Sequence, residues 1–286
     1  MIVIKSIAEV RQYIGTLRRE GRTIGFVPTM GALHEGHRSL LDRSHARVDV
    51  TVMSIFVNPA QFGPNEDLAK YPRMFDKDCA MAEAAGCGIV FAPSPEQMYP
   101  EHFGTSVAVE ELGKRMCGIT RPTHFRGVTT VVLKFFNIVM PDIAYFGQKD
   151  AQQAIIIKRM VEDLNVPVTI AVCPTVRESD GLAMSSRNAY LTARERNAAP
   201  CIHKGLLAAA ALFERGERDA AALISAIETS LGSQAPVISG EYVELVDTIT
   251  LEPLSTISNA GLLAVACRTS ESNTRLIDNI ILGGSL

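Results

Sequence analysis

Residues 24–37 read IGFVPTMGALHEGH. The apolar run Ile24–Val27 predicts a strand, and Gly31 lies in the turn after it, where a missing side chain lets the backbone approach a ligand. His34 and His37 come three positions apart where a helix is expected to begin, so they share one helix face. The first amides of a helix and the positive end of its dipole attract anions. The stretch therefore predicts a strand, a turn and a helix that together bind phosphate.

The two imidazoles are suited to reactions of nucleotides. Each can donate a hydrogen bond to a phosphoryl oxygen, and a protonated ring adds positive charge where negative charge accumulates. Histidines near a glycine are common, however, and His34 and His37 are equally compatible with a helix cap or a core turn. Both interpretations stay open at this turn, and later parts of the chain bear on the choice.

Composition indicates a folded protein with one large domain or two medium ones. The chain has 286 residues, of which 47% are hydrophobic. Its 28 basic and 31 acidic residues give a net charge of -3, and no block of lysine and arginine matches a nucleic-acid backbone. We therefore expect no nucleic-acid partner.

The sequence shows no sign of a membrane segment or of an oxidising compartment. Met1–Val10 is interrupted by Lys5 and Glu9, unlike a signal peptide, and the longest apolar run, Leu206–Phe213, is too short to span a bilayer. The cysteines lack a C-x-x-C pair, zinc-ligand spacing and a recognisable nucleophile context; they are Cys79, Cys87, Cys117, Cys173, Cys201 and Cys267. We expect a cytoplasmic protein with reduced thiols and no membrane partner.

Short β-branched runs alternate with helical patterns in the first part of the chain, which predicts a parallel sheet with crossover helices. The predicted strands are Thr23–Val27, Val50–Val57, Gly88–Ala92, Ile143–Gly147 and Val168–Val172. The predicted helices lie near Ser6–Glu20, His34–Arg47, Pro72–Ala85, Phe125–Val139 and Ala151–Leu164. Right-handed crossovers make this a doubly wound, Rossmann-like α/β sheet, whose ligands bind at the carboxyl ends of the strands.

After about Val176 the sequence pattern changes, and a second domain is expected. A polar loop leads to two alanine-rich helical patterns and then to alternating segments typical of a small antiparallel sheet. The helices are predicted at Ala193–Arg215 and Asp219–Leu231, and the strands at Tyr242–Val246, Leu262–Arg268 and Thr274–Asn279. Composition alone thus divides the chain into an α/β domain, residues 1–175, and a smaller α+β domain, residues 176–286.

A second candidate motif stands where the predicted strand Ile143–Gly147 ends. Gly147 leaves room for a ligand, Lys149 offers a point charge for phosphate, and Asp150 can cap the helix that follows. Gln153, three positions further on, is expected to face the same site. The alternative is a simple helix start with a solvated lysine.

A third candidate motif is the loop Asp180–Asn188. Ser185 and Ser186 can donate hydrogen bonds to a triphosphate, and Arg187 can spread its charge over non-bridging oxygens as the loop closes. The same composition suits an interdomain linker rich in turn-forming residues. The chain has no G-x-x-x-x-G-K-[ST] loop and no G-x-G-x-x-G after a strand, which disfavours P-loop kinases and dinucleotide oxidoreductases.

Two of these motifs resemble signatures of a known superfamily. His34-Glu35-Gly36-His37 resembles the HIGH signature of adenylate-forming nucleotidyltransferases, and Met184-Ser185-Ser186-Arg187 resembles their KMSKS loop. Further stretches are strongly similar to the pantothenate synthetase family, a resemblance that extends over essentially the whole chain; they are Ser54–Phe62, Arg121–Val128 and Arg275–Asn279. Because substrate-side and nucleotide-side segments both match, this resemblance is more specific than the HIGH signature alone.

The resemblance implies ATP-dependent condensation of (R)-pantoate with β-alanine, which yields pantothenate, AMP and pyrophosphate. A carboxylate is a poor electrophile, and joining it to AMP gives a pantoyl adenylate with a good leaving group. The resemblance also implies a homodimer, and Mg²⁺ is expected on the triphosphate. Two alternatives are another HIGH-type nucleotidyltransferase acting on a different small acid or phosphate, and a nucleotide-binding regulatory protein without turnover.

The resemblance further implies roles for particular residues. His37 is the strongest candidate for a proton donor or charge stabiliser, His34 is its partner, and Lys149 contacts the phosphates. Gln61 and Gln153 match pantoate-binding positions, and Gln61 also lies beside β-alanine. The implied ATP-binding residues are Met30, Gly31, Ala32, Leu33, His34, Glu35, Gly36, His37, Gly147, Gln148, Lys149, Asp150, Val176, Met184, Ser185, Ser186 and Arg187.

Some of these assignments have simpler alternatives or depart from the family pattern. Gln61 and Gln153 are both compatible with ordinary surface amides. This alternative is weaker for Gln61, because it follows a strand expected to be buried on both faces. Arg187 stands where KMSKS has its second lysine, and Gln148 replaces a glutamate found in many members, yet neither change removes a cationic group. No dense carboxylate cluster identifies magnesium ligands, and Asp78 is a guess.

Overall fold

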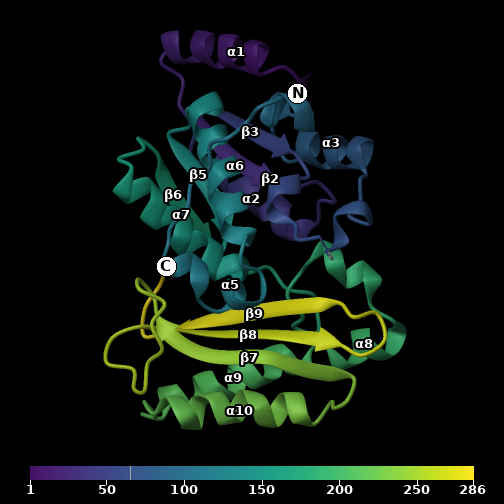
Figure 1. The fold of residues 1–286 in the computed structure, drawn as a ribbon, viewed down its shortest axis with the longest axis vertical. Coiled ribbons are helices and arrows are strands. Elements are labelled where there is room, and N and C mark those ends of the chain that lie inside the picture. The colour runs from purple at the N-terminus through teal and green to yellow at the C-terminus, as the bar shows by residue number, and fades with distance from the viewer. Residues whose placement is uncertain (65) are drawn as a thin grey trace. The chain divides into compact units, whose positions relative to one another are not determined.

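Parallel strands buried on both faces form the centre of the first of two units. A computed structural model describes residues 1–64 and 66–286, which pack as two compact units (Figure 1). The first unit comprises Met1–Gly147 and Ile156–Cys173, and the second comprises Gln148–Ile155 and Pro174–Leu286. The segment Gln148–Ile155 thus packs with residues that follow it much later in the sequence.

In the described part of the first unit, six parallel strands hydrogen-bond in the order β1-β4-β3-β2-β5-β6. They are β1 (Ile2–Ile4), β2 (Ile24–Thr29), β3 (Val50–Ile55), β4 (Ile89–Phe91), β5 (Ile143–Gly147) and β6 (Thr169–Cys173). Strands β3 and β4 extend from one side of β2, whereas β5 and β6 lie on its other side. The strand order therefore reverses between β2 and β5, the kind of switch point at which α/β sheets bind ligands.

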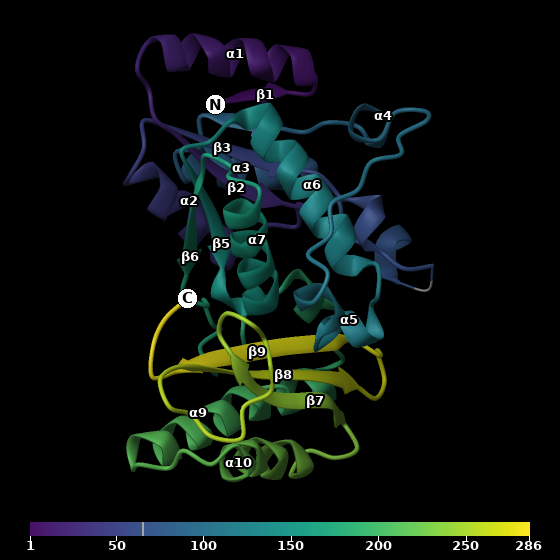
Figure 2. The same ribbon diagram turned by 60° about the vertical axis from the view of Figure 1, so that its left-hand side comes forward.

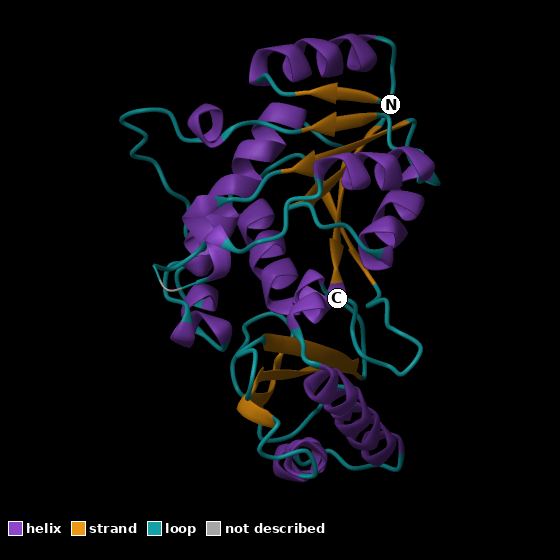
Figure 3. Cartoon of the chain, turned by 90° about the vertical axis from the view of Figure 1, so that its right-hand side faces the viewer, coloured by secondary structure: helices purple, strands orange, loops and turns teal. Residues whose placement is uncertain are grey.

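Helices cover both faces of this sheet (Figure 3). Phe26 packs with side chains of α1 and α6, and the next residue, Val27, packs with side chains of α2 and α3 on the opposite face. Because both faces are covered, the strands are largely apolar and do not alternate between apolar and polar residues. The helices are α1 (Ile7–Arg19), α2 (Glu35–His45), α3 (Phe75–Ala84), α4 (Pro95–Met98), α5 (Cys117–Thr120), α6 (His124–Val139) and α7 (Ala151–Asp163).

Short 3₁₀ helices connect some of these elements. In the first unit they are η1 (Pro59–Gln61), η2 (Asp67–Ala69) and η3 (Leu112–Lys114). In the second unit they are η4 (Gln148–Asp150), which leads into α7, and η5 (Ser186–Tyr190).

The second unit packs two helices against an antiparallel sheet. Among its described residues, three strands pair in the order β7-β8-β9, and α9 and α10 share their apolar core through Leu206, Ile227 and Val265 (Figure 1). The elements are α8 (Ala193–Ala198), α9 (Cys201–Glu214), α10 (Ala220–Gly232), β7 (Ile238–Asp247), β8 (Gly261–Thr269) and β9 (Arg275–Leu282). The predicted fold class, a doubly wound sheet with a smaller α+β part, is confirmed. The predicted domain division after Thr175 stays a prediction.

The structure differs from the predicted elements at several places. The prediction has no helix at α4 or α5, and β9 ends at Leu282, three residues beyond the predicted end at Asn279. The prediction lacks β1, an edge strand of three residues that is too short to show a period (Figure 2). The single helix predicted at Ala193–Arg215 is wrong, because α8 ends at Ala198 and α9 begins after Pro200, which has no amide to continue a helix. Strand β7 starts four residues before the predicted Tyr242, since a register shift after Gly240 interrupts its alternation.

Helix length and cysteine burial bear on two of the expectations from the sequence. Within residues 1–64 and 66–286, no helix is both long enough and apolar enough to cross a bilayer. The six cysteines, all among the described residues, form no disulfide, and burial raises the pKa of Cys87 and of Cys201 to about 11. A thiolate is therefore disfavoured at both positions.

A buried carboxylate ties the β8–β9 turn to the start of α8. Glu195 accepts hydrogen bonds from the amides of Glu271 and Ser272, both at 2.8 Å, and from the amide of Thr192 at 2.9 Å. Burial by itself raises the pKa of Glu195, but the hydrogen bonds, led by that of the Ser272 amide, outweigh burial and bring the pKa to about 2. The ionised side chain thus stabilises the second unit.

Replacing Glu195 by glutamine should lower the free energy of unfolding at neutral pH by about 1–3 kcal/mol. A folded-state pKa below the ordinary value of 4.5 means that the stabilisation is complete above that pH and is lost as the pH falls toward 2. Urea unfolding at about pH 7, 5 and 3 should therefore show a gap between wild type and Glu195→Gln that narrows in acid. The exposed Glu228→Gln serves as control, and a gap that is constant with pH contradicts the assignment.

Candidate active site

One buried carboxylate holds the turn after β2 in shape. Gly31 and Ala32 have φ values of +84° and +51°, and the left-handed region is costly for an alanine. Asp78, in the first turn of α3 and 1% exposed, accepts the amide of Ala32 at 2.9 Å and the amide of Leu33 at 2.8 Å. These charge-assisted bonds offset the strain and fix the backbone that leads into α2.

This geometry gives Asp78 a structural role, and its assignment as a magnesium ligand stays a prediction. Each of its carboxylate oxygens already accepts a backbone amide, so the structure supports a role in shaping the turn. In the part of the chain that the structure describes, no group of three or more histidine, cysteine, aspartate or glutamate side chains is arranged to hold a metal ion.

Both histidines of the turn cap α2. His34 is the N-cap residue, and its Nδ1 accepts the amide of Gly36 at 3.1 Å, while Nδ1 of His37 accepts the amide of His34 at 3.3 Å. A ring nitrogen that accepts a hydrogen bond carries no proton, so each neutral ring is protonated on Nε2. The two ring centroids lie 4.1 Å apart. Helix capping uses Nδ1, whereas phosphate binding needs the Nε2–H donor. The two roles are therefore compatible in the same ring.

Gln61 is part of a hydrogen-bonded network around η1. Its Nε2 donates to the sulfur of Met30 at 3.1 Å, and its Oε1 accepts from Nδ2 of Asn58 at 3.0 Å. Asn58, 1% exposed, also donates to the carbonyl of Gly127 at 3.1 Å and accepts from the hydroxyl of Tyr99 at 2.6 Å. The structure thus brings Gln61 to Met30, the first predicted ATP-binding residue, and the alternative of an ordinary surface amide is not supported for Gln61.

The backbone of Gln61 is held by residues for which the sequence suggested no role. Its carbonyl accepts from Nη2 of Arg121 at 3.3 Å and lies 2.9 Å from Nδ1 of His124. Arg121 also forms a two-pronged ion pair with Glu66, at 2.6 and 2.5 Å. Burial raises the pKa of Glu66, but the hydrogen bond and charge of Arg121 outweigh it and lower that pKa. Arg121 and His124 lie in a stretch noted for its family resemblance, which was the available signal.

The third motif forms an ordered turn in the second unit. The amide of Met184 donates to the carbonyl of Val176 at 3.0 Å, which brings these two predicted ATP-binding residues together. Ser185 is the N-cap of η5, and its hydroxyl accepts the amide of Arg187 at 3.3 Å. The segment is therefore ordered, and the choice between an ATP-binding loop and a linker rich in turn-forming residues stays open.

The predicted site residues are distributed over both units. Gly147 ends β5, which pairs with β2. The predicted residues of the first unit are Met30, Gly31, Ala32, Leu33, His34, Glu35, Gly36, His37, Gln61 and Gly147. Those of the second unit are Gln148, Lys149, Asp150, Gln153, Val176, Met184, Ser185, Ser186 and Arg187. Their roles in binding and catalysis stay predictions.

Comparison with known proteins identifies the family. The family model for pantoate-beta-alanine ligase matches residues 2–281. The chain belongs to the pantoate-beta-alanine ligase family. It is 52% identical to the pantothenate synthetase of Moorella thermoacetica over 282 residues, 99% of each chain, and 52% identical to pantothenate synthetase 1 of Bradyrhizobium diazoefficiens over 286 residues, 100% of this chain and 99% of that one.

Solved structures of family members agree with this assignment. Pantothenate synthetase from Thermus thermophilus matches with a TM-score of 0.92 and 44% identity over 98% of this chain and 99% of that one. The pantoate-beta-alanine ligase of Francisella tularensis, complexed with beta-gamma ATP and beta-alanine, matches with a TM-score of 0.79 and 32% identity over 100% and 99%. The predicted family is confirmed, and the chain is a ligase that joins pantoate and β-alanine.

Replacing Asp78 by asparagine should weaken ATP binding. Asparagine keeps one acceptor but places an NH₂ group against one of the two amides, so the turn at Ala32 loses a bond that offsets its strain. We expect KM for ATP to rise about tenfold or more, equivalent to roughly 1.4 kcal/mol, while the protein stays folded. Steady-state kinetics and thermal unfolding measure both effects. Asp76→Asn, on the same helix turn, is the control, and equal KM values for the two variants contradict the assignment.

Replacing Gly127 by alanine should displace Gln61. A Cβ at Gly127 would lie 2.2 Å from the carbonyl oxygen of Ala60, so η1 must move away from α6. We expect a loss of about 1–3 kcal/mol in stability and a larger rise in KM for pantoate than for ATP. Thermal unfolding and kinetics test this, with Gly15→Ala as the control because nothing lies within 4 Å of the added carbon there. Unchanged stability and KM in Gly127→Ala contradict the prediction.

Proposed function

We propose that the chain condenses (R)-pantoate with β-alanine at the expense of ATP, through a pantoyl adenylate. The match of the family model over residues 2–281 is the observation that carries the proposal. The pantoate carboxylate attacks the α-phosphorus of ATP and releases pyrophosphate. The amine of β-alanine then attacks the acyl carbon, forms the amide bond and releases AMP.

His34 and His37 act in the first half of this reaction as hydrogen-bond donors. Their Nδ1 atoms accept backbone amides, so each neutral ring has its proton on Nε2, where it can meet a phosphoryl oxygen. Donors placed before the reaction begins stabilise the charge that develops at the phosphorus. His37 is the main stabiliser, and His34 supports it.

Lys149 and Arg187 supply the positive charge for the same ATP. An ammonium suits a phosphate as a point charge, and a guanidinium spans two non-bridging oxygens. The turn capped by Ser185 and the hydrogen bond between Val176 and Met184 support this assignment, because they order the segment that carries Arg187. The other ATP-binding residues are Met30, Gly31, Ala32, Leu33, Glu35, Gly36, Gly147, Gln148, Asp150, Val176, Met184, Ser185 and Ser186.

Gln61 and Gln153 bind pantoate, and Gln61 also lies beside β-alanine. The geometry around Gln61 supports this part of the proposal, since Asn58 and Met30 fix its side-chain amide. A fixed amide orients the carboxylate for attack, and orientation accounts for much of the rate of such reactions. Gln153 lies in the first turn of α7.

Mg²⁺, a dimer of two copies and a cytoplasmic location belong to the same proposal. The described residues contain no carboxylate cage, which fits a magnesium ion that arrives on the phosphates of ATP and keeps several waters. The family resemblance supports the dimer, and six cysteines without a disulfide framework support the reducing location.

Pyrophosphate release tests the reaction and the two main residues together. It should depend on pantoate in the wild type, and His37→Ala and Lys149→Ala should each lower kcat by about 100-fold or more, equivalent to about 3 kcal/mol, with a smaller effect on ATP affinity. The exposed His102→Asn and Lys204→Ala are matched controls. Release that ignores pantoate contradicts the reaction, and a His37→Ala variant that loses only affinity favours a nucleotide-binding regulator.

A further inference from the structure

Two consecutive residues of β9 hold backbone segments that carry predicted ATP-binding residues. Asp278 and Asn279 are each 3% exposed and lie in the stretch Arg275–Asn279, which is part of the family resemblance but has no role in the reaction described above. Buried polar side chains must find hydrogen-bond partners, so the partners they choose are informative. All of the contacts below lie within the second unit.

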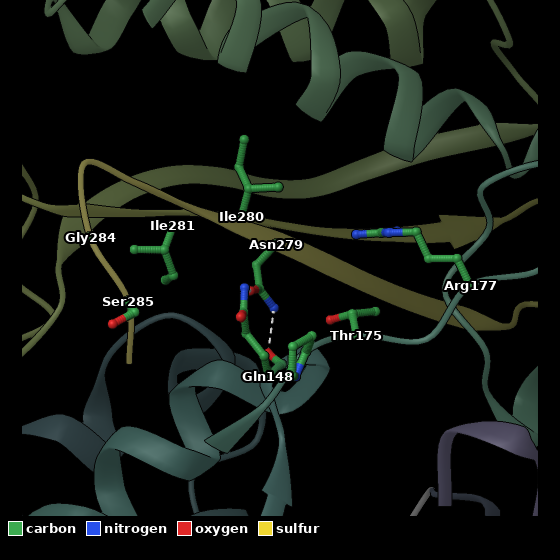
Figure 4. Close-up of a pocket in the computed structure, with 9 residues that line it drawn as sticks. Gln148, Thr175, Arg177, Asn279, Ile280, Ile281, Gly284 and Ser285 are labelled. Carbon is green, nitrogen blue, oxygen red and sulfur yellow. Dashed lines mark hydrogen bonds between the residues drawn. The ribbon is translucent and has the colours of Figure 1, made fainter. Parts of the chain in front are cut away.

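Asn279 fixes the segment that contains Lys149. Its Nδ2 donates to the carbonyl of Gln148 at 2.9 Å and to the carbonyl of Lys149 at 3.0 Å. The side chain of Gln148 returns a hydrogen bond to Oδ1 of Asn279 at 3.4 Å, and Figure 4 shows these two side chains pointing toward each other. One amide group thus holds two successive carbonyls of η4.

Asp278 fixes the base of the loop that carries Arg187. Its carboxylate pairs with both Nη atoms of Arg177, at 2.6 and 3.0 Å. Arg177 in turn donates to the carbonyl of Gly181 at 3.1 Å and forms a β-bridge with Ala183. The ends of the loop are therefore held together next to the hydrogen bond between the Met184 amide and the Val176 carbonyl.

A cavity lies beside these contacts, so the position of η4 depends on the hydrogen bonds from Asn279. It has a volume of about 280 Å³ and is lined by Gln148, Pro174, Thr175, Arg177, Asn279, Ile280, Ile281, Gly284 and Ser285 (Figure 4). Because this side of Gln148 faces open space, close packing there cannot set the position of η4. The directional hydrogen bonds from Asn279 can set that position instead.

We propose that Asn279 and Asp278 are positioning residues for ATP binding. Asn279 holds the backbone from which the Lys149 side chain extends, and Asp278 acts through Arg177 on the loop that carries Arg187. Since the two residues are neighbours on one rigid strand, they fix the spacing between the two cationic groups. The inference rests on the proposed function for the roles of Lys149 and Arg187.

A double-mutant cycle separates positioning from general stability. Asn279→Ala should lower kcat/KM for ATP by about tenfold, but by less than about twofold when Lys149 is already alanine, because the effect passes through Lys149. Asn279→Asp, which keeps the volume but cannot donate to two carbonyls, should behave like Asn279→Ala. Thr269→Val is the stability control, since it removes a buried hydroxyl of β8 that hydrogen-bonds Ser272 and Thr274 and leaves η4 untouched.

The outcomes of this cycle are distinguishable. Full retention of the Asn279→Ala loss in the Lys149→Ala background overturns positioning through Lys149. The positioning role is also overturned if Asn279→Ala and Thr269→Val have equal kcat/KM for ATP. In both cases, a large loss of kcat/KM in Lys149→Ala leaves the proposed function in place. No loss in Lys149→Ala overturns the positioning role and the proposed function of Lys149 together. Thermal unfolding of each variant verifies that the kinetics are measured on folded protein.

Discussion

Burial of both faces of the parallel sheet is the constraint on which the rest of the first unit depends. Phe26 and Val27 are fully buried on opposite faces, so the strands leave no open surface for polar chemistry. Side chains that are to meet a polar ligand must therefore come from the segments at the strand ends. Strands β2 and β5 are neighbours at the switch point, and β2 leads directly into the turn at Gly31 and the capped start of α2. The apolar pattern of the strands therefore determines where the functional turn lies.

Buried polar side chains shape the segments that the sheet leaves irregular. Asp78 accepts two amides of the turn after β2, Glu195 accepts three amides around α8, and Asn279 donates to two carbonyls of η4. Each of these side chains is at most 3% exposed. Leaving a buried charge or amide without hydrogen-bond partners is costly. The observed backbone conformation of each segment is therefore strongly favoured over alternatives that would break these bonds. Segments without regular secondary structure thereby acquire a defined backbone.

The sequence predicts secondary-structure elements and local motifs better than it predicts which residues hydrogen-bond to one another. Strands such as Ile143–Gly147 and the histidine pair are readable because their signals are local in the chain. Pro200 is a local signal too, but the alanine-rich residues on both sides of it continue the helical pattern. By contrast, the bonds from Ala32 to Asp78 and from Gln148 to Asn279 join residues 46 and 131 positions apart. No period or propensity links such residues, and the packing of Gln148–Ile155 with the second unit is equally invisible to a linear reading.

The capping geometry also determines which ring nitrogen of each histidine is available to donate a hydrogen bond. A proton on Nδ1 of His37 would break its bond with the amide of His34, and a proton on Nδ1 of His34 would break its bond with Gly36. In this capped geometry each ring, when neutral, can donate through Nε2. In the proposed reaction Lys149 and Arg187 supply positive charge for the phosphates, because an ammonium acts as a point charge and a guanidinium can span two oxygens. Under that proposal the histidine turn supplies hydrogen-bond donors, and cationic segments elsewhere in the chain supply the charge.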